Sequence, residues 1–181
     1  MYRCVMADPP WQERGTGKIK RGADRHYSLL DENSIVYVMR EPMEEVGPDA
    51  HLWLWATNNH LPEAFRVMSA LGFRYVTNLV WVKDKFGLGQ YLRGQHELCL
   101  LGVRGACQYP EVRNVPSVVM APRTKHSRKP NEAYRAIERV SPGPRLSLFE
   151  REIRDGWTVW GDQALDPLEV TRRAKIEGWE V

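Results

Sequence analysis

Short apolar runs alternate with helical patterns along this chain. The runs are rich in Val, Leu, Trp and Phe, residues that favour strands, and helical spacing is clearest over Leu61–Leu71 and Pro130–Val140. Strands are expected at Tyr2–Ala7, His51–Thr57, Tyr75–Lys83, Glu97–Val103, Ser117–Ala121, Arg145–Phe149 and Thr158–Trp160. This alternation predicts an α/β fold in which a mostly parallel sheet is flanked by helices.

Length and composition limit this fold to one domain. The chain has 181 residues, which corresponds to one domain at roughly 150 residues each. Hydrophobic residues at 43% and charged residues at 27% are ordinary globular values, and they exclude a disordered chain. We assign residues 1–165 to the folded domain and residues 166–181, whose pattern is weakly amphipathic, to a C-terminal tail.

The cysteine pattern and the length of the apolar runs indicate in which cellular compartment the protein is expected. Cys4, Cys99 and Cys107 are an odd number without a C-x-x-C motif, so neither a disulfide framework nor a thiolate metal site is expected. No window approaches the roughly 18 apolar residues of a membrane span. The amino terminus carries no signal-peptide pattern. We therefore expect a cytoplasmic protein that binds no metal and no membrane.

The net charge of +3 hides an uneven distribution. The segment Gln12–Ser28 has five basic residues against two acidic ones, and Ala121–Arg154 has nine against four. The rest of the chain is consequently acidic. Two basic segments favour a surface that follows the phosphates of a nucleic acid, although such runs also occur as solvated faces.

The chemistry of the chain centres on Asp8-Pro9-Pro10-Trp11, which follows the first predicted strand. Ligands of open α/β sheets bind outside the carboxyl ends of strands, so Asp8 projects toward a site. The prolines fix the backbone and donate no hydrogen bonds, which leaves the Asp8 carboxylate and the Pro9 carbonyl as acceptors. Two such acceptors suit the N–H groups of an exocyclic amine, and Trp11 would stack on its base. The alternative is a Pro-Pro turn with a buried Trp.

The motif and its surroundings resemble the MT-A70 family of adenine-N6 methyltransferases, in particular its minimal prokaryotic or phage-type members. The resemblance runs from Val5 to Gln163 and rests on an ordered series of segments. These are D-P-P-W at 8–11, HLWLW at 51–55, LVWVK at 79–83, HELCLLGV at 96–103, SRKPNEAY at 127–134, ERVSPG at 138–143, LFER at 148–151 and WGDQ at 160–163. It implies a Rossmann-like methyltransferase domain in which the catalytic motif precedes the cofactor-binding segment.

The resemblance also implies a cofactor, S-adenosyl-L-methionine, and the residues that bind it. Lys129 matches the lysine that holds the carboxylate of the cofactor, and Asp8 borders the same site. Phe149 and Arg151 match a ribose-contacting segment in which Glu150 replaces a frequent glycine. Asp162 and Gln163 match a polar pair that reads the adenine of the cofactor. Each has a plainer alternative, such as a surface lysine for Lys129 or a strand-edge charge pair for Glu150.

On the substrate side, the resemblance points to two loops that flank the target base. One, Gln12–Ser28, holds Arg25 and Tyr27; the other, Asp84–Gln95, lies between Lys83 and the pair His96-Glu97. His96 has the alternative of an ordinary strand-end histidine. Trp53, Trp55 and Trp81 lie in strands, so we expect them in the core.

We therefore expect methyl transfer to N6 of adenine in DNA. The alternatives are the same reaction on RNA, a catalytically silent nucleic-acid-binding subunit, and methylation of cytosine N4 or of protein amides. Relatives work as paired subunits that face each other around the loop after the Trp81 strand, so a homodimer is also expected.

Overall fold

The computed structural model describes residues 1–12, 29–106, 112–123, 128–150 and 152–160. Within them, seven strands form one sheet in the order β5-β3-β4-β2-β1-β6-β7. The strands are β1 (Tyr2–Ala7), β2 (Val46–Ala56), β3 (Arg74–Val82), β4 (His96–Arg104), β5 (Val118–Met120), β6 (Arg145–Leu148) and β7 (Trp157–Trp160). Neighbours run parallel except where β4 pairs with β2 and β3. The mostly parallel sheet predicted from the sequence is confirmed.

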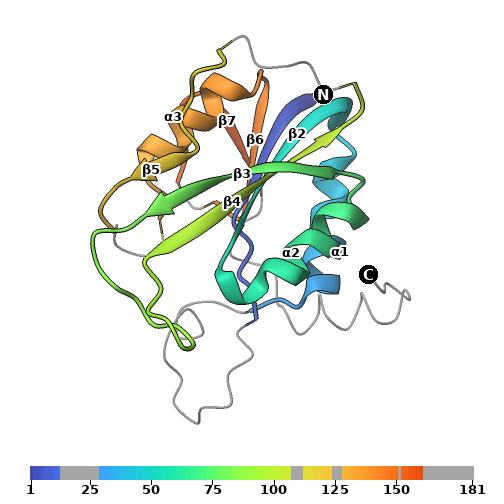
Figure 1. Ribbon diagram of the computed structural model, residues 1–181. Coiled ribbons are helices and arrows are strands. Elements are labelled where there is room, and N and C mark those ends of the chain that lie inside the picture. The colour runs from blue at the N-terminus through green and yellow to red at the C-terminus, as the bar shows by residue number, and fades with distance from the viewer. Residues whose placement is uncertain (13–28, 107–111, 124–127, 151, 161–181) are drawn as a thin grey trace.

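Helices cover the sheet on both faces (Figure 1). Helices α1 (Glu32–Met43) and α2 (Leu61–Ala70), preceded by the 3₁₀ turn η2 (Asn58–His60), pack on one face, and α3 (Asn131–Val140) packs on the other. The alternation of β1 explains how one strand serves both layers. Val5 and Ala7 join the core beneath α1 and α2, whereas Cys4 and Met6 join the core beneath α3. The result is a three-layer α/β domain.

Two elements differ from the sequence-based expectation. Strand β2 begins at Val46 rather than at His51, because Gly47, Pro48 and Asp49 read as a turn but form an irregular start whose register with β1 shifts. Helix α1 was not among the predicted helices. The Asp31 side chain caps it by accepting from the Ser34 amide at 2.8 Å, while its run of β-branched residues and the proline in its last turn obscure the helical pattern.

Candidate active site

Asp8 follows the last residue of β1, a strand in the interior of the sheet (Figure 1). Strand β2 lies on one side of β1, and β6, which comes much later in the chain, lies on the other. The Asp8 amide donates to the Leu148 carbonyl at the end of β6 over 3.4 Å. In open α/β sheets, ligands bind at such a topological switch point, outside the carboxyl ends of the strands. The motif predicted as catalytic thus lies where the topology itself favours a ligand site.

Four charged side chains of alternating sign form a network around Asp8, which we call the charged network. Lys129 Nζ lies 2.5 Å from Asp8 Oδ2 and 3.4 Å from Glu97 Oε2. Lys83 Nζ in turn donates to Glu97 Oε1. The Lys129 side chain is only 7% exposed, whereas that of Asp8 is 32% exposed. The fold therefore joins three predicted site regions, which lie far apart in sequence, through one buried ammonium group.

Within the charged network, the pKa values of the two carboxyl groups, Asp8 and Glu97, are shifted in opposite directions. Burial raises the pKa of Asp8, and Glu97 and Glu150 act in the same direction, so that the lowering effect of Lys129 is outweighed. Burial also acts to raise the pKa of Glu97, but Lys129 and Lys83 together lower it below the ordinary value. The pKa of Lys129 is itself raised because Asp8 and Glu97 overcome its desolvation. The pKa values of the two carboxylates are therefore shifted in opposite directions, that of Asp8 upward and that of Glu97 downward.

Trp11 does not form the open stacking surface that the motif suggested. Its side chain is 8% exposed, and its ring stacks on His60 of η2 with centroids 5.7 Å apart. Its indole nitrogen donates to the Trp55 carbonyl over 2.9 Å. The sequence-based expectation of a base platform is therefore corrected: η2 fills one face of the indole, and Trp11 anchors the turn after Asp8. The alternative, a Pro-Pro turn with a buried Trp, describes this side chain.

The two proline carbonyls of the motif both accept hydrogen bonds. Pro9 O accepts from the Trp11 amide over 2.9 Å, and Pro10 O accepts from the Leu30 amide over 2.8 Å. A carbonyl oxygen has two lone pairs, so Pro9 O retains capacity for a second donor. The turn after Asp8 is thus held by the backbone just before α1.

A cavity of about 310 Å³ lies beyond the end of β6 and beside the first turn of α3. Glu150 lines it and accepts a hydrogen bond from Tyr134 Oη of α3, a residue that the sequence analysis did not single out. The Arg154 guanidinium covers the Tyr134 ring at 3.6 Å. Phe149, which precedes Glu150, packs against the core in a left-handed conformation with φ of 63°. Such a conformation is costly for a bulky residue and occurs often at ligand sites.

The other residues that the sequence analysis named are one exposed histidine, three core tryptophans and five residues that the structure does not describe. His96 is the exposed first residue of β4, beside Glu97. Trp53, Trp55 and Trp81 are all buried, which confirms their assignment to the core. The other predicted contacts lie outside the described residues: Arg25, Tyr27, Arg151, Asp162 and Gln163.

The described residues offer neither a cluster of metal ligands nor a membrane-spanning helix. Among them, no group of three or more His, Cys, Asp or Glu side chains could hold a metal ion. None of the described helices has the length and apolar character needed to cross a membrane.

The fold defines a Rossmann-like α/β domain, and its candidate ligand site lies between the ends of β1 and β6. Residues 2–163 match the MT-A70 family model, and the chain belongs to that family. It is similar to the N(6)-adenosine-methyltransferase catalytic subunit METTL3 of Homo sapiens, with 29% identity over 94% of this chain and 30% of the relative. It is also similar to the Danio rerio N(6)-adenosine-methyltransferase subunit METTL3, with 30% identity over 96% of this chain and 31% of the relative. Similarity to the human N(6)-adenine-specific methyltransferase METTL4 is 28% identity over 91% of this chain and 38% of the relative. The chain spans about a third of the length of these curated relatives.

Proposed function

We propose that this protein is an S-adenosyl-L-methionine-dependent methyltransferase that acts on N6 of adenine in nucleic acid. The observation that carries the proposal is the Asp8 carboxylate, which lies at the switch point beside a buried lysine in a member of the MT-A70 family. The names of the relatives, N6-adenosine and N6-adenine methyltransferases, support the same chemistry.

The residues around Asp8 fit such a cofactor. S-adenosylmethionine supplies an electrophilic methyl group when bound, and it carries a sulfonium, an ammonium and two ribose hydroxyls. The carboxylates of Asp8 and Glu150 match these cations and donors, and the cavity of about 310 Å³ beside Glu150 is within the usual size of a ligand pocket, about 300–1,000 Å³. Lys129 as the partner of the cofactor's carboxylate remains a prediction, since that carboxylate would share the ammonium with Asp8 and Glu97.

On the substrate side, Asp8 is proposed to orient the amine of adenine. A carboxylate accepts several hydrogen bonds, so Asp8 can accept from an N–H group while it is bound by Lys129. The Pro9 carbonyl would accept from the other N–H, which favours a pyramidal nitrogen whose lone pair is available for bonding. The bond from the nitrogen to the methyl group would form as the sulfur–methyl bond breaks, with the neutral thioether as the leaving group. The nitrogen would then lose one proton, and the raised pKa of Asp8 would suit that carboxylate to accept it.

A methylation assay tests this proposal. Labelled S-adenosylmethionine is incubated with matched single- and double-stranded DNA and RNA, and the product nucleosides are identified. Asp8→Asn should lower kcat/KM about 10²- to 10³-fold, the usual cost of losing one electrostatic contact to the reacting group. Asp49→Asn is the matched control, since Asp49 is exposed near the start of β2 and accepts a hydrogen bond from Ala106.

The assay also decides between the candidate substrates. We infer DNA ahead of RNA, and transfer to RNA alone would overturn that order. A product other than N6-methyladenine would assign a different acceptor. No transfer to any of the four nucleic acids, together with no thermal shift on addition of S-adenosylmethionine, would identify a silent subunit and refute the proposal.

We further propose that the protein is a homodimer. Sedimentation at the concentration of the assay tests this, and a species of 21.0 kDa would exclude it. A cytoplasmic location also remains a prediction; it is supported by the buried free thiols of Cys4 and Cys99.

A further inference from the structure

His60 is a buried histidine beside the turn that follows Asp8, and the proposed reaction assigns it no part. It is the last residue of η2 and is only 6% exposed. Its ring stacks on the Trp11 indole, and its Nε2 lies 2.9 Å from the Gln12 carbonyl oxygen. One imidazole therefore contacts two consecutive residues of the segment that carries the catalytic motif.

The hydrogen bonds of His60 define which ring nitrogen carries the proton. A carbonyl oxygen only accepts, so Nε2 donates to Gln12. In the neutral ring Nδ1 is then an acceptor, and the Thr57 hydroxyl, 2.8 Å away, donates to it. The His60 amide also donates to the Thr57 carbonyl over 3.0 Å. Both ring nitrogens are thus engaged, and Thr57 holds the imidazole in one orientation.

The position of Trp11 determines where the Pro9 carbonyl points. The Trp11 amide donates to Pro9 O over 2.9 Å, which closes a three-residue turn centred on Pro10. Such turns favour a central φ of about −75°, close to the value that a proline ring imposes. The bond orients Pro9 O and leaves one lone pair for a second donor. A displacement of Trp11 would open this turn and change the orientation of Pro9 O relative to the Asp8 carboxylate.

The other contacts of this segment do not fix the plane of the indole. The Gln12 amide donates to the Leu30 carbonyl over 3.0 Å, which holds the backbone. The Trp11 indole nitrogen donates to the Trp55 carbonyl over 2.9 Å, which holds one atom of the ring. A ring held at one atom can pivot about it. The stacked imidazole of His60 blocks that rotation and holds the Gln12 carbonyl as well.

We propose that His60 is a positioning residue for methyl transfer. Through Trp11 and Gln12 it holds the Pro9 carbonyl in the orientation that accepts the second N–H of the target amine beside Asp8. The inference rests on the proposed function for the identity of that amine. A misplacement of about 1 Å can cost a reaction about 10²-fold in rate. Because this alignment matters in the transition state, its loss should lower kcat and leave KM nearly unchanged.

Steady-state methylation kinetics test the role in the reaction. His60→Ala should lower kcat about 10- to 100-fold with KM within about threefold of the wild type. His60→Gln keeps an N–H donor for the Gln12 carbonyl and should recover part of the loss. Thr57→Val, at an exposed position with little risk to the fold, should lower kcat about 2- to 10-fold, as for one lost hydrogen bond.

His51→Ala is the matched control for His60→Ala. His51 is also a buried histidine whose Nδ1 lies within hydrogen-bond distance of a hydroxyl, that of Ser141, but it lies at the other end of β1. It should leave kcat unchanged per folded molecule. Circular dichroism confirms that each variant is folded.

Hydrogen exchange of the Trp11 amide, followed by nuclear magnetic resonance, reports on the turn without substrate or cofactor. The amide closes the turn at Pro9 O, so its exchange rate measures how often the turn opens. His60→Ala should raise this rate at least about 10-fold, whereas His51→Ala should leave it unchanged.

The outcomes separate this inference from the proposed function. An unchanged exchange rate of the Trp11 amide in His60→Ala overturns the inference alone. Faster exchange with an unchanged kcat, or an equal loss of kcat in His51→Ala, also overturns it, because the orientation of Pro9 O would then not limit the reaction. Faster exchange in a protein whose wild type transfers no methyl group overturns the proposed function, while the hold of His60 on the turn is upheld.

Discussion

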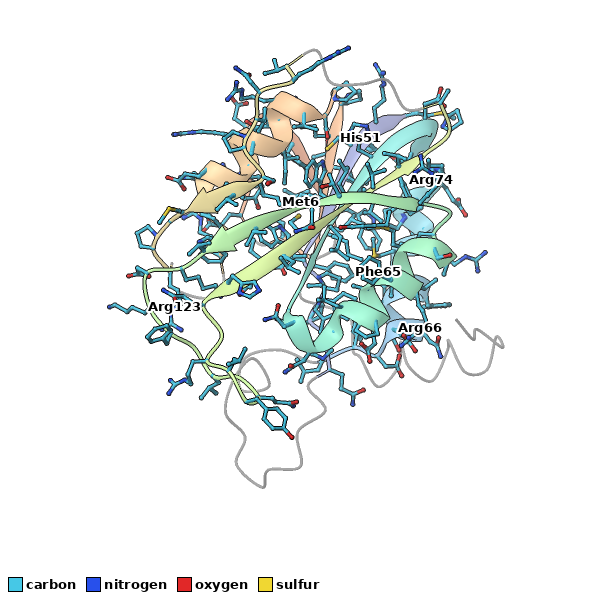
Figure 2. The ribbon with its side chains drawn as sticks, viewed as in Figure 1. Met6, His51, Phe65, Arg66, Arg74 and Arg123 are labelled. Carbon is cyan, nitrogen blue, oxygen red and sulfur yellow. The ribbon has the colours of Figure 1, made fainter. Side chains whose placement is uncertain are left out.

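Two buried polar clusters lie at opposite ends of β1, and they differ in charge. The charged network at the carboxyl end holds four ionisable side chains, Lys129 and three others. The cluster at the other end, which we call the hydroxyl cluster, is centred on Ser141 just after α3. Ser141 Oγ accepts a hydrogen bond from the Trp53 indole nitrogen over 2.8 Å. It also lies 2.7 Å from Nδ1 of His51, a residue labelled in Figure 2.

The side chains that meet at Ser141 in the hydroxyl cluster are neutral. Burial lowers the pKa of His51, and nearby Arg3 acts in the same direction, so the ring stays neutral. Burial raises the pKa of the Cys4 thiol, which is hydrogen-bonded to Ser141, to about 12. The side chains of His51, Trp53, Cys4 and Ser141 pair with one another as neutral groups, which is the inexpensive way to place polar side chains in a core, and the Arg145 guanidinium bonds to the Ser141 carbonyl at its edge.

The charged network is organised differently. Taking charges out of water costs several kcal/mol per ion, and apolar residues of similar volume often stabilise a fold as well as a buried ion pair does. Stability therefore gives little reason for keeping Lys129 in this place. The comparison indicates that the hydroxyl cluster serves the fold, whereas the charged network serves the site, and the two should respond differently to mutation and to pH.

The largest expected effect on stability is that of Lys129→Met. The change leaves the Asp8 and Glu97 carboxylates without their shared ammonium, and breaking a buried pair in this way costs about 3–5 kcal/mol. Urea unfolding of the variant measures the loss. The deficit should shrink on acidification, because the uncompensated carboxylates then take up protons.

Lys83→Met is the matched control for that change. Among the described residues, the Lys83 ammonium forms an ion pair with Glu97 and lies 4.7 Å from the centroid of the Trp81 ring, and Glu97 keeps Lys129 when Lys83 is lost. The expected cost is smaller, about 1–3 kcal/mol, as for one hydrogen bond to a charged group. Equal losses for the two variants would contradict the view that Lys129 is the centre of the network.

A smaller effect is expected in the hydroxyl cluster. Ser141→Ala removes the partner of the Trp53 indole and of His51, and a buried donor without a partner costs about 1–3 kcal/mol. Ser147 in β6 provides the control, because its buried hydroxyl has no hydrogen-bond partner among the described residues. Ser147→Ala should be neutral or slightly stabilising. Neither change should alter methyl transfer per folded molecule. A loss of activity in Ser141→Ala would contradict the view that the hydroxyl cluster serves the fold and not the site.

The sequence predicted correctly those features of the fold and the candidate site that depend on a short-range pattern of residues. The alternation of apolar residues located all seven strands, and the D-P-P-W motif after β1 located Asp8. The connection of Asp8 to Lys129 spans 121 residues and depends on which strands become neighbours, which no local pattern contains. Trp11 was misassigned for the same reason, since the side chain that covers it, His60, comes from a distant turn.

The smallest effects, and the sharpest contrast, are expected from pH. The pKa of His51 is lowered in the fold, so the unfolded chain binds more protons, and the contribution of His51 to stability is lost as the pH falls below about 6.5. The pKa of Asp8 is raised, so the folded chain binds more protons, and its contribution to stability grows as the pH falls toward 3.8. The two clusters thus respond to acid with opposite signs.

Unfolding free energies across this pH range, for the wild type, His51→Gln and Asp8→Asn, test the contrast. The stability advantage of the wild type over His51→Gln should decrease as the pH falls, whereas its advantage over Asp8→Asn should increase. The same protonation of Asp8 removes an acceptor, so kcat/KM should fall on the acid side with a midpoint above the ordinary pKa of 3.8. Parallel slopes for the two variants would refute the contrast, because both clusters would then be neutral or both charged.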